Sequence, residues 1–251
     1  MRLESIRLRF PAVVACGLLS LLSLAATAQD AADTLPLTPG VYHLNLARAG
    51  EPTVGYAISV PPDYSSSTPV PLILALHFGV GGGSATGAGG DMLDILVGPG
   101  LASLGAIIVA PDSVRGNWST PENEKAVTAL IDAVTAGYAV DRKKIAVTGF
   151  SMGGSGSWHF AQKFPEIFSA AIPIASRPPE SAAGWKVPVF AIHSRDDQVA
   201  PFTPADTRIA ELQKAGVNAR MIALAGISHY QTHRFQDALR QAAPWLHEVW
   251  K

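Results

Sequence analysis

Cysteine is almost absent from this sequence. The 251 residues contain a single one, Cys16, and it lies in the N-terminal apolar run. The rest of the chain has no partner for a disulfide, so its stability must come from a hydrophobic core. Hydrophobic residues make up 48% of the chain, and a chain of this length can bury enough of them to form such a core.

An excess of charge of one sign is missing as well. The formal net charge is −1, and no cluster of lysines and arginines occurs along the chain. Binding to nucleic-acid phosphates or to an anionic membrane surface needs clustered basic side chains, so neither partner is expected. After the N-terminal run, no apolar stretch is long enough to span a bilayer, and no transmembrane segment is predicted.

The first 28 residues have the features of a secretory signal peptide. Arginines precede an apolar run over residues 12–26, and the small-residue pattern Ala26-Thr27-Ala28 would allow cleavage after Ala28. We therefore expect residues 29–251 to form one exported domain, periplasmic or extracellular. A lipoprotein signal ending at Cys16 is the less favoured alternative, because the apolar run continues well past that cysteine.

Eight short segments are predicted to be β-strands. The first two, residues 41–47 and 54–60, flank a turn at 48–53 and predict an antiparallel hairpin. The other six are nearly continuous apolar runs, which is typical of parallel strands buried on both faces; they are residues 72–78, 105–112, 144–150, 170–176, 187–194 and 219–226.

Segments with helical periodicity alternate with these strands, and they are residues 122–138, 154–164, 204–215 and 232–250. The alternation predicts an α/β fold, with a mostly parallel sheet and helices on both faces. The interval between the strands at 170–176 and 187–194 is too short for a cap domain, so we expect an open site. Ligands of such sheets bind at the carboxyl ends of the strands, so reactive residues just after strands are the functional candidates.

One candidate is a serine among glycines. Residues Gly149-Phe150-Ser151-Met152-Gly153 have the pattern G-x-S-x-G between a predicted strand and a predicted helix. The glycines would permit a sharp turn that exposes Ser151 as a nucleophile, and the Met152 amide could donate to a developing oxyanion. The alternative is an ordinary strand-to-helix turn that contains a serine.

A nucleophilic serine needs a base and an acid that orients the base, and in this kind of fold the acid precedes the histidine along the chain. Asp196 and Asp197 both follow the strand at 187–194, and His229 and His233 both follow the strand at 219–226. The residues alone leave both pairs open. Either aspartate could instead be a helix cap or a loop charge, and either histidine a surface residue.

These segments resemble single-domain α/β-hydrolase serine esterases, a group with predicted peptidases, phospholipase/carboxylesterases and polyhydroxybutyrate-depolymerase-like esterases. The similarity runs from about residue 56 to the C-terminus and is carried by LILALHFGVGG, VAPDS, GFSMGGSGSWHFAQKFPEIFSAAIPIAS, AIHSRDDQVAP and GISHYQT. It implies the α/β-hydrolase fold and a carboxylesterase with a Ser-His-Asp triad, an acyl-enzyme intermediate and no cofactor. A peptidase of the same fold and a non-catalytic binding module are the alternatives.

The resemblance also selects among the candidates. The family pattern H-G-x-x-D-x-x-V-P, aligned over residues 193–201, implies Asp197 as the acid, and the family histidine after a glycine-containing loop corresponds to His229. A second oxyanion donor comes in the family from an H-G-G or H-G-x loop, which is His77-Phe78-Gly79 here. Phe78 replaces the first glycine, so the Gly79 amide is favoured as donor and the Phe78 amide comes second.

The substrate is expected to be a small-molecule or polymeric ester. Trp118 and Trp158, together with Phe78, could wall an apolar pocket for it, although such residues more often belong to the core. The sequence does not indicate which acyl or alcohol group is accepted.

Two further kinds of site have partial motifs in the sequence. The glycine-rich stretch 79–90, followed by Asp112 at the end of the next strand, could hold a dinucleotide, but Ser84 replaces the third glycine of G-x-G-x-x-G. The spacing of His229 and His233 would suit zinc, but Tyr230 stands where H-E-x-x-H has its glutamate. Neither a cofactor nor a metal is therefore predicted.

Overall fold

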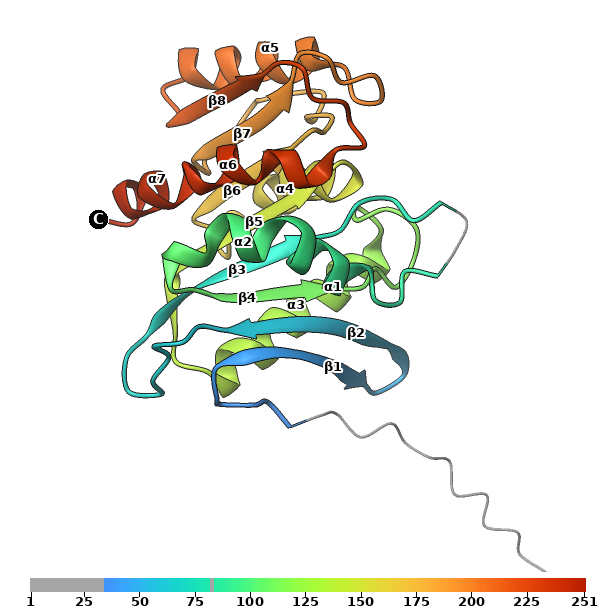
Figure 1. Cartoon of the computed structure of the whole chain (residues 1–251), viewed down its shortest axis with the longest axis vertical. Coiled ribbons are helices and arrows are strands. Elements are labelled where there is room, and N and C mark those ends of the chain that lie inside the picture. The colour runs from blue at the N-terminus through green and yellow to red at the C-terminus, as the bar shows by residue number, and fades with distance from the viewer. Residues whose placement is uncertain (1–33, 82–83) are drawn as a thin grey trace, which may run out of the picture. The chain divides into compact units, whose positions relative to one another are not determined.

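A computed structural model describes residues 34–81 and 84–251, so the predicted signal peptide lies outside the described residues. Within the described residues there are eight strands: β1 (Gly40–Arg48), β2 (Glu51–Val60), β3 (Val70–Leu76), β4 (Ile107–Pro111), β5 (Val140–Phe150), β6 (Ala170–Ile174), β7 (Val189–Ser194) and β8 (Ala219–Leu224). They form one sheet in the order β1-β2-β4-β3-β5-β6-β7-β8 (Figure 1). β2 runs antiparallel to both of its neighbours, and all other neighbouring strands are parallel.

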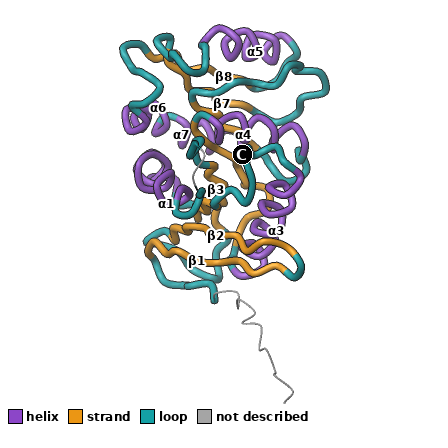
Figure 2. Tube along the Cα trace, turned by 90° about the vertical axis from the view of Figure 1, so that its right-hand side faces the viewer, coloured by secondary structure: helices purple, strands orange, loops and turns teal. Residues whose placement is uncertain are grey.

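Helices cover both faces of this sheet, as predicted (Figures 1 and 2). One face carries α3 (Pro121–Gly137), α4 (Met152–Lys163) and α5 (Phe202–Lys214), and the other carries α1 (Ala88–Met92), α2 (Gly98–Leu101), α6 (Gln236–Arg240) and α7 (Ala242–Val249). Successive side chains of a strand point to opposite faces. In β3, Leu74 joins the core under α3 and α4, whereas its neighbour Ile73 joins the core under α2 and α7.

The start of α3 shows how the sequence sets a helix boundary. Thr120 caps the helix, because its hydroxyl accepts a hydrogen bond from the Asn123 amide at 3.4 Å. Pro121 occupies the first helical position, where its missing N–H costs nothing, and two glutamates in the first turn suit the positive end of the helix dipole.

The turn of the N-terminal hairpin is shorter than the predicted one. β1 and β2 pair as far as Arg48 opposite Glu51, which leaves only Ala49 and Gly50 between the strands. Gly50 has a φ of 73°, and this left-handed conformation lets a two-residue turn close the hairpin.

A helical segment that the sequence pattern did not indicate lies between β3 and β4. It comprises α1, a π-helical turn (Leu93–Val97), α2 and a 3₁₀ turn (Ala102–Leu104). A Cβ on Gly89 would lie 2.1 Å from the carbonyl oxygen of Ala110 in β4. Glycine disfavours helix, but its missing side chain is what allows this helix to lie so close to the sheet.

Two other features bear on the predicted architecture. The helix predicted at 232–250 is divided into a 3₁₀ turn (Thr232–Phe235), α6 and α7. Residues 175–188, between β6 and β7, contain neither helix nor strand, so no cap covers the sheet edge there. No helix in the described part of the chain is both long and apolar enough to cross a bilayer.

Candidate active site

Ser151 lies at the tip of a sharp turn between β5 and α4. Its φ of 56° and ψ of −114° place it in a region that residues other than glycine rarely occupy, at a cost of about 1–3 kcal/mol. The Ser151 amide donates to the carbonyl oxygen of Ile174 at 3.0 Å, which ties the turn to the end of β6. The packed strand and helix on either side therefore hold the serine in a conformation that projects it at the carboxyl edge of the sheet.

Gly153 allows the beginning of α4 to pack against the end of β3. A Cβ at this position would lie 1.9 Å from the carbonyl oxygen of Leu76 and 2.7 Å from that of His77. Because only glycine fits, Met152 comes to lie beside the loop that follows β3. A Cβ on Gly79 would be in ordinary contact with the Cβ of Met152, at 4.0 Å.

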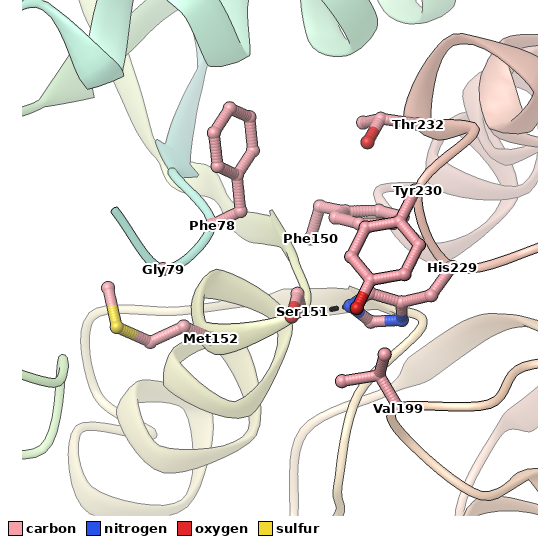
Figure 3. Close-up of a pocket in the computed structure, with 9 residues that line it drawn as sticks. All are labelled: Phe78, Gly79, Phe150, Ser151, Met152, Val199, His229, Tyr230 and Thr232. Atoms are coloured by element: carbon pink, nitrogen blue, oxygen red, sulfur yellow. Dashed lines mark hydrogen bonds between the residues drawn. The ribbon is translucent and has the colours of Figure 1, made fainter. Parts of the chain in front are cut away.

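His229 connects Ser151 to Asp197. Its Nε2 lies 2.8 Å from Ser151 Oγ, and its Nδ1 lies 2.8 Å from Asp197 Oδ2 (Figure 3 shows the first of these bonds). A carboxylate oxygen accepts, so Nδ1 carries the ring proton and Nε2 is left to accept the hydroxyl proton of Ser151. The Asp197 side chain is fully buried and His229 is 5% exposed, so bulk water scarcely competes for these bonds.

The loop after β7 holds Asp197 in place. The Asp197 Oδ1 atom accepts hydrogen bonds from the Val199 amide at 2.9 Å and the Ala200 amide at 2.8 Å. His193 closes the same loop, because its Nε2 donates to the Ala200 carbonyl at 2.8 Å. Burial lowers the pKa of His193 below its ordinary value, which favours the neutral ring. The importance of His193 was not recognised from the sequence.

The other member of each candidate pair lies elsewhere. Asp196 Oδ2 accepts from the Gly226 amide at 2.6 Å, and Arg234 donates to the Gly226 carbonyl at 2.9 Å. His233 is exposed in the 3₁₀ turn before α6. The structure thus brings Asp197 and His229 to Ser151, and it uses Asp196 to hold the loop that leads to His229.

The predicted oxyanion donors are the backbone amides of Met152, Gly79 and Phe78, and all three residues line the same hollow as Ser151. Met152 is the first residue of α4, so its amide has no acceptor within the helix and lies at the positive end of the helix dipole. Among the described residues, no hydrogen bond uses the amide of Met152, Phe78 or Gly79.

His77 fixes the loop that carries Phe78 and Gly79. Its Nε2 accepts from the Ser113 amide at 3.0 Å, and its Nδ1 donates to the Phe78 carbonyl at 2.6 Å. The His77 carbonyl accepts from Trp118 Nε1 at 3.0 Å. These bonds require a neutral His77 ring with its proton on Nδ1. Burial lowers the pKa of His77 and so favours the neutral ring.

A trans peptide group points its N–H opposite to its carbonyl. The bond to Trp118 therefore orients the Phe78 amide, and the bond from the His77 ring orients the Gly79 amide. The sequence identified the loop, but the part that the His77 side chain plays in it is visible only in the structure.

An apolar hollow of about 450 Å³ opens beside Ser151 (Figure 3). Figure 3 shows Phe78 and Met152 on one side of Ser151 and His229 with Tyr230 on the other. The lining is completed by Gly79, Phe150, Val199 and Thr232. Tyr230 is 81% exposed and Val199 is 40% exposed, so the hollow has an apolar rim that faces solvent.

The two tryptophans suggested for the pocket do not line this hollow. Trp158 lies two turns along α4 from Ser151, is 1% exposed and packs edge-to-face against Trp185 in the core. Trp118 is equally buried and borders a separate hollow of about 280 Å³ beside Met152 and Ser155. Most of the surface of both tryptophans is buried in the core, and whether Trp118 contacts substrate through its own hollow stays a prediction.

The carboxylate of Asp112 accepts hydrogen bonds within the fold and is therefore not free to bind a nucleotide ribose. Its two oxygen atoms accept from the amides of Gly87 and Gly89 at the start of α1, at 2.8 and 2.9 Å. Residues 82 and 83 of the glycine-rich stretch lie outside the described residues. In the ranges that the structure describes, no three His, Cys, Asp or Glu side chains are grouped as metal ligands would be.

Sequence comparison shows that this chain is similar to known esterases. A family model described as PETase, PET hydrolase-like, matches residues 91–248, a range that includes Ser151, Asp197 and His229. A probable feruloyl esterase C from Aspergillus terreus is 29% identical over 178 residues, which cover 66% of this chain and 60% of that protein. The chain spans 60%, 47% and 64% of the lengths of three curated relatives that it matches.

Solved structures show the same fold. A thermostable esterase superposes with a TM-score of 0.66 at 22% identity, covering 83% of this chain and 62% of that one. A ferulic acid esterase superposes with a TM-score of 0.65 at 19% identity, covering 84% of this chain and 99% of that one. These likenesses confirm the predicted α/β-hydrolase fold. Because the family model extends over more than half of the sequence, we conclude that the chain belongs to the PET hydrolase-like family.

Proposed function

We propose that this protein is an exported serine esterase that hydrolyses carboxylic ester bonds. The observation that carries the proposal is the pair of 2.8 Å hydrogen bonds linking Asp197, His229 and Ser151, with the serine held at a positive φ. In this proposal Ser151 Oγ attacks the ester carbonyl carbon while His229 Nε2 takes the hydroxyl proton. Asp197 keeps the proton on Nδ1 and stabilises the imidazolium that forms.

The remaining steps follow from the same groups. The carbonyl oxygen becomes an oxyanion, which the Met152 amide and the amide of Gly79 or Phe78 stabilise. The intermediate collapses to an acyl-enzyme as the alcohol leaves with the proton from His229. Water then attacks the acyl group, His229 takes the proton of the water, and the acid is released as Ser151 recovers its hydrogen.

The shape and lining of the 450 Å³ hollow support an apolar or aromatic ester as substrate. Aromatic rings of Phe78, Phe150 and Tyr230 line it, and the exposed rim at Tyr230 and Val199 can contact a bulky or polymeric chain. The names of the feruloyl esterase relative and of the PET hydrolase-like family both point to aromatic esters. Export rests on residues 1–28, whose basic start, apolar run and Ala26-Thr27-Ala28 pattern are those of a signal peptide.

One experiment tests export and chemistry together. The protein is recovered from the extracytoplasmic fraction of its host, and its intact mass is measured before and after reaction with a serine-directed organophosphonate. We expect a chain that begins at Gln29 and one added phosphonate, mapped to Ser151. The same preparation is assayed with p-nitrophenyl esters of increasing chain length, methyl ferulate, a polyester film and a peptide anilide.

Ser151→Ala should abolish labelling and lower ester hydrolysis by several orders of magnitude. Ser181→Ala, which removes an exposed hydroxyl from the loop between β6 and β7, is the matched control and should behave as the parent protein. Labelling of another residue, or hydrolysis that survives Ser151→Ala, would contradict the esterase proposal. A lipid-modified Cys16 at the N-terminus would establish a lipoprotein instead, and a clear preference for the anilide would indicate a peptidase.

A further inference from the structure

A second hollow, of about 230 Å³, adjoins Ser151 on the side of β6. It shares Ser151, Met152 and Val199 with the larger apolar hollow. Its other lining residues come from the first turn of α4 and from the two loops after β6 and β7, and they are Ser155, Ala175, Ser176, Arg177 and Ala200. A substrate held at Ser151 can therefore place one part in each hollow.

Among the described residues that line this second hollow, Arg177 alone is charged. Arg177 is exposed, and its Nη2 reaches the Val199 carbonyl at 3.5 Å, the limit of a hydrogen bond, so nearly all of its donors are left to solvent or to a ligand. Among the described residues, no carboxylate forms an ion pair with Arg177, although four other arginines pair with one: Arg115, Arg208, Arg220 and Arg240. A positive charge without a counter-ion therefore borders the hollow beside the nucleophile.

Ser176 supplies a second unused donor. It is 3% exposed and lines the same hollow, yet its hydroxyl makes no hydrogen bond to any residue that the structure describes. Its oxygen is not among the fully buried, unpartnered side-chain atoms of the described residues. The hydroxyl is therefore open to the hollow and is free to bond a polar group that enters it.

The backbone that carries these two side chains is fixed in place. Ala175 has a φ of 47°, and its amide donates to the Ile192 carbonyl at 2.9 Å. Ser155 Oγ, one turn into α4, donates to the Arg177 carbonyl at 3.2 Å. The segment is thus tied to β7 and to the helix that begins after Ser151, so its side chains hold their position relative to the nucleophile.

We propose that Ser176 and Arg177 form a binding site for a carboxylate group of the substrate. The proposal rests on the proposed esterase function and narrows its substrate class to esters that carry a free carboxylate. The apolar part of such an ester occupies the larger hollow, and the carboxylate accepts from the Arg177 guanidinium and the Ser176 hydroxyl in the smaller one. A planar guanidinium suits a carboxylate because it can donate two parallel hydrogen bonds.

The test compares each carboxylate ester with its amide of nearly the same shape, which is uncharged and replaces one acceptor oxygen by an NH2 group. One pair places the group on the alcohol part, as 4-carboxybenzyl butyrate and 4-carbamoylbenzyl butyrate. The other places it on the acyl part, as monobenzyl adipate and its carbamoyl analogue. We expect kcat/KM to favour the carboxylate about tenfold in one of the two pairs, mainly through KM, and to lose that preference in 0.5 M NaCl.

Arg177→Ala should bring the carboxylate-to-amide ratio of kcat/KM to about one, and Arg177→Glu should invert it. Ser176→Ala should lower the ratio several-fold. Arg142→Ala is the matched control: it removes an exposed arginine from the opposite end of β5 and should leave the ratio unchanged. Because the readout is a ratio, a variant that is merely less active or less folded does not imitate the result.

Binding gives a readout that needs no turnover. Calorimetry with 4-(hydroxymethyl)benzoate should detect binding to the Ser151→Ala variant. The double variant Ser151→Ala, Arg177→Ala should bind it about tenfold more weakly. If neither ester pair shows a carboxylate preference, or if Arg177→Ala leaves the ratio and the binding unchanged, the carboxylate site is refuted. Absence of Ser151-dependent hydrolysis of benzyl butyrate would instead refute the esterase function, and the calorimetry would still decide on the site.

Discussion

At the scale of single residues, two adjacent aspartates contact different partners. Asp197 is buried and accepts from His229 and from two backbone amides, whereas Asp196 accepts from the Gly226 amide before the histidine loop. Asp197 can thus hold the imidazole in the correct tautomer, and Asp196 can act only through the position of the loop.

We therefore predict that Asp197→Asn lowers kcat for ester hydrolysis by about 10⁴, the effect known for an aspartate that orients a catalytic histidine. An asparagine at position 197 would turn the imidazole toward the wrong tautomer. Asp196→Asn keeps an oxygen that can accept from Gly226, so a loss of about tenfold or less is expected. The measurement is kcat for both variants on one activated ester.

His229 and His233 allow the same comparison for the catalytic base. His229→Ala should be at least as inactive as Asp197→Asn, while His233→Ala, at an exposed position in the 3₁₀ turn, should keep most of the activity. Circular dichroism of each variant separates loss of chemistry from loss of fold. If Asp196→Asn or His233→Ala proved the inactive member of its pair, the assignment of the acid or the base would be wrong.

At the scale of secondary-structure elements, the close approach of α4 to β3 creates the site. Gly153 has no room for a side chain, and the same contact sets the Met152 amide beside Phe78 and Gly79. Packing, rather than helix propensity, therefore decides which residue can follow Met152.

We predict that Gly153→Ala lowers the free energy of unfolding by about 2–3 kcal/mol, because the added methyl group forces α4 and β3 apart. kcat should fall with it, since the Met152 amide moves with the helix. Urea unfolding and ester kinetics of the same variant measure the two effects.

Gly79→Ala is the matched substitution for stability. A Cβ there meets only Met152, at an ordinary distance of 4.0 Å, so the free energy of unfolding should change by about 1 kcal/mol or less. Equal losses of stability in the two variants would show that crowding at Gly153 is relieved more easily than the geometry indicates.

Element boundaries also show where sequence patterns stop being informative. All eight predicted strands occur. Six of them are continuous apolar runs, which report burial on both faces, and the first two are marked by the turn between them. The segment from α1 to the turn at Ala102–Leu104 was missed, since its glycines serve contact with β4 and mask the helical pattern. The predicted helix at 232–250 is interrupted because periodicity reports which residues are buried but not where the backbone changes direction.

At the scale of the whole molecule, two buried histidines couple stability to pH. Burial lowers the pKa of His77 and of His193 below 6.5, although Asp112, Asp91 and Asp197 oppose the shift. The unfolded chain therefore binds these protons more readily than the folded protein does. Their contribution to stability is complete above about pH 6.5 and is lost as the pH falls below it.

We predict that the free energy of unfolding decreases between pH 7 and pH 5.5, with a slope of up to about 1.4 kcal/mol per pH unit for each histidine. Urea unfolding followed by tryptophan fluorescence at several pH values gives this slope. His193→Gln should reduce this slope by up to about 1.4 kcal/mol per pH unit, which is the contribution of one histidine.

His247→Gln, on the exposed side of α7, is the control for that measurement. It should leave the slope as it is in the parent protein. A free energy of unfolding that stays constant or rises on acidification would mean that His77 and His193 are charged in the folded protein.

The sequence by itself determined the strands, the alternation with helices, the fold class and the short set of candidate residues at strand ends. It could do so because burial leaves a local record in hydrophobic periodicity, and because glycine marks places that exclude side chains. The tertiary structure alone decided the order of the strands and the burial of Trp118 and Trp158 in the core. It shows Asp197 rather than Asp196 beside His229, a choice that the residues left open and that the family resemblance implied. It also placed the side chains of Ser176 and Arg177 beside Ser151. Ser151 and His229 are 78 residues apart, and such contacts depend on how strands pair and on the direction in which each loop turns, which local periodicity does not encode.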